Sequence, residues 1–84
     1  MKYDYITFRS VTYAQRGEGA LRGAGIDCVL QRTPKWMEER GCGYCLRLRQ
    51  RDVMPAVALL RENEIAFRKV YAQRDSGRLE EITV

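Results

Sequence analysis

Alternation of apolar and polar residues predicts β-strands in this chain, because successive side chains of a strand point to opposite faces of a sheet. The pattern is clearest in the stretches YDYITF and YCLRLR. The predicted strands are Tyr3 to Phe8, Ile26 to Thr33, Tyr44 to Arg49 and Ile65 to Tyr71. In the third strand Leu46 and Leu48 share one face, and the opposite face carries Cys45, Arg47 and Arg49.

Apolar residues at helical spacing predict two helices between these strands. The first covers Val11 to Ala24, with Ser10 as its N-cap and Gly25 as the residue that ends it. The second follows a cap at Asp52 and runs to about Asn63. Two interior glycines cost the first helix about 1 kcal/mol each relative to alanine, so this helix depends on tertiary packing. They are Gly17 and Gly19.

The resulting element order, βαββαβ, predicts an α+β ferredoxin-like fold. This fold is a two-layer sandwich, in which two helices cover one face of a four-stranded antiparallel sheet. A chain of 84 residues is too short for two hydrophobic cores, so we expect a single domain over residues 1–84. Its core is predicted over about residues 3–71, and residues 72–84 form a tail or a short added strand.

The sheet face away from the helices is predicted to be both aromatic and basic. The residues expected to face the helices are Ile6, Phe8, Leu46, Leu48, Ala66 and Val70. The residues expected on the open face are Tyr5, Thr7, Arg47, Arg49, Phe67, Lys69 and Tyr71. Such a face suits a binding module for single-stranded nucleic acid or for another protein. Nucleic acid is the less favoured partner, because an RNA-recognition domain has aromatics where the third strand has arginines.

The composition of the chain indicates the cellular compartment of the protein but does not identify a binding partner. No apolar run approaches the roughly 20 residues that cross a bilayer, and the amino-terminal stretch lacks the pattern of a secretory signal. We therefore expect a cytoplasmic protein without membrane contact. The three cysteines are an odd number, which rules out a fully paired set of intramolecular disulfides. In a reducing compartment, the cysteines are better explained as reactive thiols or as metal ligands.

Candidate chemistry is concentrated in the stretch TPKWMEERGCGYCLRLR, residues 33–49, which holds two of the three cysteines. Cys42 lies between Gly41 and Gly43, and flanking glycines allow backbone shapes that turn amide N–H groups toward an anion. A nearby guanidinium, from Arg47 or Arg40, would lower the pKa of Cys42. Glu38 and Glu39 oppose this effect if they lie equally close.

Cysteines also serve in proteolysis, in zinc binding and in dithiol redox chemistry. The chain has no histidine, which excludes cysteine–histidine proteolysis. A structural zinc needs three or four thiolates, and Cys28 is expected to be a small buried hydrophobe, so no metal or other cofactor is predicted. A thiol redox protein that uses Cys42 and Cys45 as a dithiol remains an alternative.

Several short motifs, in this order, resemble those of a known family of small bacterial proteins. They are ITFRS at 6–10, GID at 25–27, TPK at 33–35, CGYCLR at 42–47 and VY at 70–71. Over about residues 3–71 the chain resembles the selenium/sulfur carrier protein-like family, also numbered domain of unknown function 3343. The family's cysteine matches Cys42, and Cys45 stands where the family has alanine. Gly41 stands where the family has serine.

The resemblance implies a carrier or accessory protein rather than a stand-alone enzyme. Cys42 would accept sulfur or selenium from a cysteine desulfurase-like donor and present it, as a persulfide or selenopersulfide, to an acceptor enzyme. Arg47 would stabilise the anion and Gly43 would give access to it. Cys45 is either a resolving thiol, which releases the cargo and leaves a disulfide, or a replacement of one small residue by another. The sequence is also compatible with a homodimer.

Overall fold

The computed structural model describes residues 2–33 and 43–84. The described strands are β1 (Tyr3–Phe8), β2 (Cys28–Arg32), β3 (Tyr44–Arg49), β4 (Val70–Gln73) and β5 (Leu79–Ile82). The helices are α1 (Val11–Gly23), the 3-10 turn η1 (Gln50–Asp52) and α2 (Val53–Glu62). The bounds predicted for β1 and β3 are confirmed, and those predicted for the two helices differ by one residue at an end.

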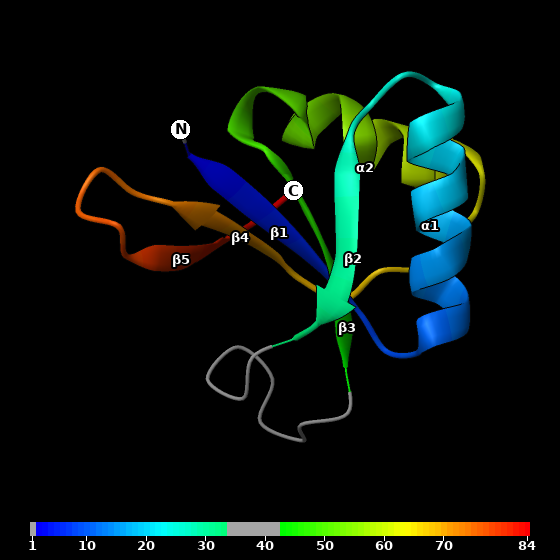
Figure 1. Ribbon diagram of the computed structural model, residues 1–84, viewed down its shortest axis with the longest axis horizontal. Helices are drawn as coiled ribbons and strands as arrows, with labels where there is room; N and C mark the ends of the chain where they lie inside the picture. Colours follow the sequence, from blue (N-terminus) through cyan, green and yellow to red (C-terminus); the bar gives the residue numbers. More distant parts are fainter. Residues whose placement is uncertain (1, 34–42) are drawn as a thin grey trace.

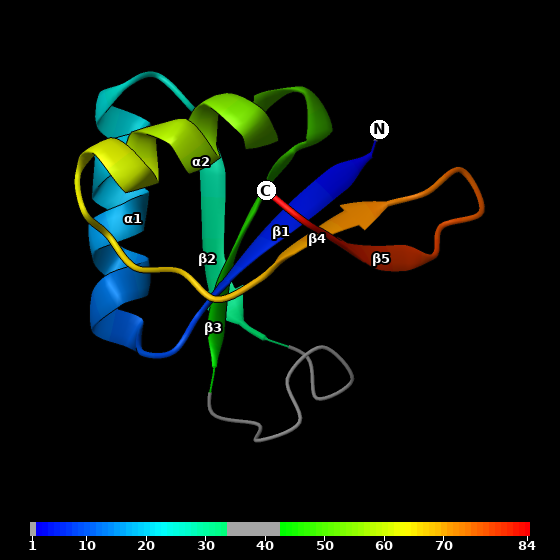
Figure 2. The ribbon, with the colours of Figure 1, turned by 180° about the vertical axis from the view of Figure 1, so that it is seen from behind.

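The strands form one antiparallel sheet in the order β2-β3-β1-β4-β5. Figures 1 and 2 show both helices on the same side of this sheet, with β4 and β5 extending beyond them. The α+β class and the two helices are confirmed. The sheet has five strands rather than the four of the predicted fold, because residues 79–82, predicted to lie in a tail or a short added strand, pair with β4. The four-stranded ferredoxin-like description therefore matches only in part.

The hydrophobic core lies between the sheet and the helices. Ile6 of β1 is opposite Leu46 of β3, and both side chains are fully buried. Leu21 of α1 and Leu60 of α2 close the core from the other side. The predicted inward faces of β1 and β3 are therefore confirmed. Neither helix in the described ranges has the length and apolar content needed to span a bilayer.

Hydrogen bonds at the ends of the helices test the predicted caps. The side-chain oxygen of Ser10 accepts a hydrogen bond from the backbone N–H of Tyr13 at 3.3 Å, as an N-cap does. Gly25 has a φ of 82°, which lets the chain leave α1, and this confirms its predicted role. Asp52 occupies the N-cap position of α2, but its side chain makes no capping hydrogen bond.

The last predicted strand is shifted toward the carboxyl terminus. Residues 65–69 belong to no strand, and Arg68 and Lys69 form hydrogen bonds with Thr7 of β1. The alternation consequently breaks, so that Ala66 is exposed rather than facing the helices. Phe67 packs against the core instead of lying on the open face, and the guanidinium carbon of Arg61 is 5.8 Å from its ring centroid.

Asp4 is a buried carboxyl group within β1, with an exposed fraction of only 1%. Its side-chain oxygen accepts a hydrogen bond from the backbone N–H of Gln73 at 3.3 Å. Burial raises the pKa of Asp4, and this hydrogen bond and the positive charge of Arg74 oppose the shift less strongly. The folded protein therefore binds the Asp4 proton more tightly than the unfolded chain does.

This shift predicts a pH-dependent effect of Asp4→Asn on stability. The stabilising contribution of Asp4 is fully present below its unfolded pKa of about 3.9, and it is lost as the pH rises through the folded pKa. The free energy of unfolding of Asp4→Asn, relative to the original protein, should therefore increase between pH 3 and pH 7. Urea denaturation at several pH values measures it, with the exposed Glu62→Gln as the control. A relative stability that decreases with pH would contradict the prediction.

Candidate functional site

The stretch singled out in the sequence, residues 33–49, comprises the connection between β2 and β3 and then β3 itself. The described residues that flank the connection are Thr33 and Gly43, whose backbones are joined by a hydrogen bond from the N–H of Thr33 to the carbonyl of Gly43 at 3.1 Å. Both residues are buried. Figures 1 and 2 show that β2 ends and β3 begins at the same end of the sheet. Cys42 and Gly41, together with Arg40, Glu38 and Glu39, lie outside the described residues.

Cys45 lies on β3 with its side chain on the face opposite the helices. In the sheet it stands between Thr7 of β1 and Gln31 of β2. Its exposed fraction is 0%. Burial raises the pKa of the Cys45 thiol, and hydrogen bonding from Thr33 and Gln31 and the charge of Arg47 oppose this less strongly. A buried thiol with a raised pKa is a poor nucleophile near neutral pH.

Thr33 contributes a buried hydroxyl group to the surroundings of Cys45. Its oxygen has no hydrogen-bond partner within the ranges that the structure describes. The hydroxyl group is therefore free to donate its proton to the sulfur of Cys45 when that sulfur is a thiolate. Thr33, Gln31 and Cys45 form a small polar cluster directly next to the segment that contains Cys42.

Arg47 points away from that segment. Its guanidinium carbon lies 4.6 Å from the ring centroid of Tyr3, a cation–π contact. Tyr3 is opposite Arg49, so it is two residues farther from Gly43 along β3 than Arg47 is. The Nε atom of Arg47 is buried and has no hydrogen-bond partner among the described residues. The charge of Arg47 therefore lies toward the far end of β3.

Cys28 belongs to the core, which confirms that it behaves as a buried hydrophobe. It is opposite Leu48 on the helix side of the sheet and has an exposed fraction of 3%. Burial raises the pKa of the Cys28 thiol; Arg22 lowers it less strongly, and Glu18 and Asp27 add small increases. Within residues 2–33 and 43–84, no group of three or more cysteine, aspartate or glutamate side chains is arranged to hold a metal.

The open face of the sheet is less suited to stacking bases than the sequence indicated. Tyr5 and Tyr71 are opposite each other on β1 and β4, as expected. Phe67, however, contributes to the core, and the Lys69 ammonium group is 3.6 Å from the carboxylate of Glu81. The open face therefore lacks the predicted Phe67 ring, and the charge of Lys69 is paired with a carboxylate.

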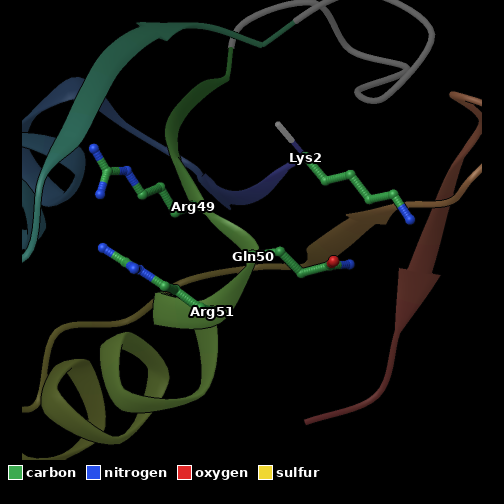
Figure 3. A pocket seen from close by; sticks show the side chains of 4 residues that line it. All are labelled: Lys2, Arg49, Gln50 and Arg51. Carbon is green, nitrogen blue, oxygen red and sulfur yellow. The ribbon is translucent and has the colours of Figure 1, made fainter.

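A basic cavity lies at the end of β3 that is remote from Gly43, and the sequence reasoning missed it. Its volume is about 340 Å³, and it is lined by Lys2, Arg49, Gln50 and Arg51 (Figure 3). The sequence LRLRQR at residues 46–51 is typical of a solvated face with salt bridges. In the described residues, Lys2 pairs with Asp75, but no ion pair involves Arg49 or Arg51. The closely spaced arginines Arg47, Arg49 and Arg51 are the sequence feature from which this basic cavity could have been predicted.

Comparison with known proteins identifies the family. The model of the family described as Putative Se/S carrier protein-like matches residues 2–72. No curated protein and no solved structure matches the chain.

Proposed function

This chain belongs to the Se/S carrier protein-like family, and on that premise we propose that it carries a terminal sulfur or selenium atom on Cys42. The proposed donor is a cysteine desulfurase-like enzyme, and an acceptor enzyme receives the cargo. A reducing cytoplasm is the proposed compartment, because the mechanism needs a free thiol. The match to the family over residues 2–72 is the observation that carries the proposal.

The state of the other two thiols supports Cys42 as the carrier. Cys28 and Cys45 are both buried, and burial raises the pKa of each. The thiolate is the nucleophilic form of cysteine, so neither thiol is suited to attack a bulky enzyme-bound persulfide. The flanking residues Gly41 and Gly43 are proposed to give a partner access to Cys42 and to turn amide N–H groups toward its sulfur.

The loading step is a sulfur transfer between two thiols. The Cys42 thiolate attacks the outer sulfur of the donor's persulfide and forms a new S–S bond. The donor's own S–S bond breaks, and its cysteine leaves as a thiolate, so no external oxidant or reductant is required. The product is a Cys42 persulfide, or a selenopersulfide when the transferred atom is selenium.

Two routes of release follow from this product. A nucleophile of the acceptor enzyme attacks the outer atom and regenerates the Cys42 thiolate. Alternatively, the Cys45 thiolate attacks the inner sulfur, expels hydrosulfide or hydroselenide and leaves a Cys42–Cys45 disulfide, which a cellular thiol must then reduce. The burial of Cys45 favours the first route, and Cys45 then serves as a small packing residue. A role of Arg47 in stabilising the persulfide would require its guanidinium to leave the ring of Tyr3.

The proposal predicts the site of a mass adduct. Protein incubated with a cysteine desulfurase and cysteine should gain one sulfur atom, about 32 Da, on the peptide that contains Cys42. Cys42→Ser should gain none, whereas Cys28→Ser and Cys45→Ser should load as the original protein does. Mass spectrometry under non-reducing conditions measures the adduct. Its absence from Cys42, or equal loading of Cys42→Ser, would refute the proposal.

A further inference from the structure

Three arginines near the end of β3 have no carboxylate partner within the described residues. Other cations of this region are paired: Lys2 with Asp75, and Arg22 with Glu18 at 3.5 Å. In contrast, no ion pair in the described ranges involves Arg47, Arg49 or Arg51. Asp52 follows Arg51 directly and Asp27 lies near Arg49, yet neither forms an ion pair with them. This end of the sheet therefore keeps uncompensated positive charge.

Two cavities meet at Arg49. One, of about 340 Å³, is lined by Arg49 and Arg51 together with Lys2 and Gln50. The other, of about 260 Å³, is lined by eight residues that include Tyr3, Arg47 and Arg49. Figure 3 shows the side chains of Arg49 and Arg51 extending in the same direction, whereas Lys2 extends the opposite way. The two guanidinium groups are thus presented together beside a hollow.

The chemistry of these groups selects a class of ligand. A guanidinium group offers a planar set of donors that matches the oxygens of phosphate or carboxylate, and several such groups favour a doubly charged anion. Arg47 lines the second cavity and adds a third positive charge at this place. The stacking of Arg47 on Tyr3 also fixes its side chain before any ligand binds.

We propose that Arg47, Arg49 and Arg51 bind a phosphate-type oxyanion, either free phosphate or the phosphate group of a small molecule. The six residue steps from Gly43 to Arg49 along β3 span roughly 20 Å. The site is therefore distinct from the segment that contains Cys42, and it does not depend on the proposed carrier function.

Titration with inorganic phosphate at constant ionic strength tests the site. The backbone amide signals of residues 49–52 in ¹H–¹⁵N spectra should shift and saturate, and sodium chloride at the same ionic strength should not reproduce this. Arg49→Gln and Arg51→Gln should each weaken binding by at least about tenfold. Arg78→Gln removes the same charge from an exposed position in the β4–β5 turn and should bind as the original protein does.

Further ligands separate the two sources of the phosphate group. If a small molecule is the natural source, adenosine monophosphate should bind more tightly than inorganic phosphate, and adenosine should not bind. Equal affinity for the two phosphates supports the free anion. Equal weakening in Arg78→Gln, a response to chloride alone, or binding of an RNA oligonucleotide without binding of phosphate would each overturn the proposal. Arg49→Gln and Arg51→Gln should still acquire the 32 Da adduct, which keeps the outcome separate from the carrier test.

Discussion

In the native protein, iodoacetamide is expected to alkylate Cys42 at least about 100-fold faster than Cys28 or Cys45 at pH 7. The exposed fractions of Cys28 and Cys45 are 3% and 0%, so a reagent reaches either thiol only when the surrounding structure opens. Burial also raises both pKa values, which lowers the fraction of reactive thiolate. The thiol of Cys42 is proposed to be accessible to the reagent and to have a pKa that burial does not raise.

Mass spectrometry of peptides, sampled over time, gives the three rates separately. In concentrated urea the differences should largely disappear, because the unfolded chain exposes all three thiols. Cys42→Ser should leave the slow rates of Cys28 and Cys45 unchanged in the native protein. Rapid alkylation of Cys45 in this variant would show that its thiol is accessible, and it would revive its role as a resolving thiol.

Gly17→Val is expected to lower the free energy of unfolding by about 2 kcal/mol, through overpacking of the core. A Cβ atom at Gly17 would lie 3.0 Å from the Phe8 ring and 3.3 Å from a methyl carbon of Leu46 and of Leu60. All three neighbours are fully buried, so the core has little room to adjust. The close contact outweighs the better helix propensity of valine, which amounts to a few tenths of a kcal/mol.

The same helix offers a matched control. A Cβ atom at Gly19 would meet no atom within 4 Å, so Gly19→Val should keep or slightly raise the stability. Urea denaturation followed by circular dichroism gives both free energies of unfolding. Equal effects of the two substitutions would contradict the packing role assigned to Gly17 and would leave only helix propensity to explain both.

Much of the fold could be predicted from the sequence where local pattern and tertiary packing agree. The alternation of β1 and β3 predicted both their bounds and their buried faces, because each is a central strand with one side against the helices. The sequence predicted only that Gly17 lowers the stability of the helix α1 relative to alanine. Its close approach to Phe8 depends on a strand nine residues earlier in the chain, so no local pattern reveals it.

The errors arise where distant residues decide the outcome. Alternation from Ile65 onward placed Phe67 on the open face, but irregular chain before β4 changes the phase and turns its ring to the core. The strand β5 has a weak apolar pattern and is fixed by its pairing with β4. Cys45 was assigned to the correct face, yet its complete burial depends on neighbours from other strands, including Gln31 of β2.

The hydrogen bond between Thr33 and Gly43 joins the two ends of the connection from β2 to β3. The paired strands β2 and β3 hold the two attachment points together, so the cost of closing this connection is borne by the sheet and changes only slowly with its length. A change in the length of this connection is therefore expected to alter the free energy of unfolding by only about 0.6 kcal/mol for each doubling. The proposed carrier chemistry restricts such changes to positions other than Cys42 and its flanking glycines.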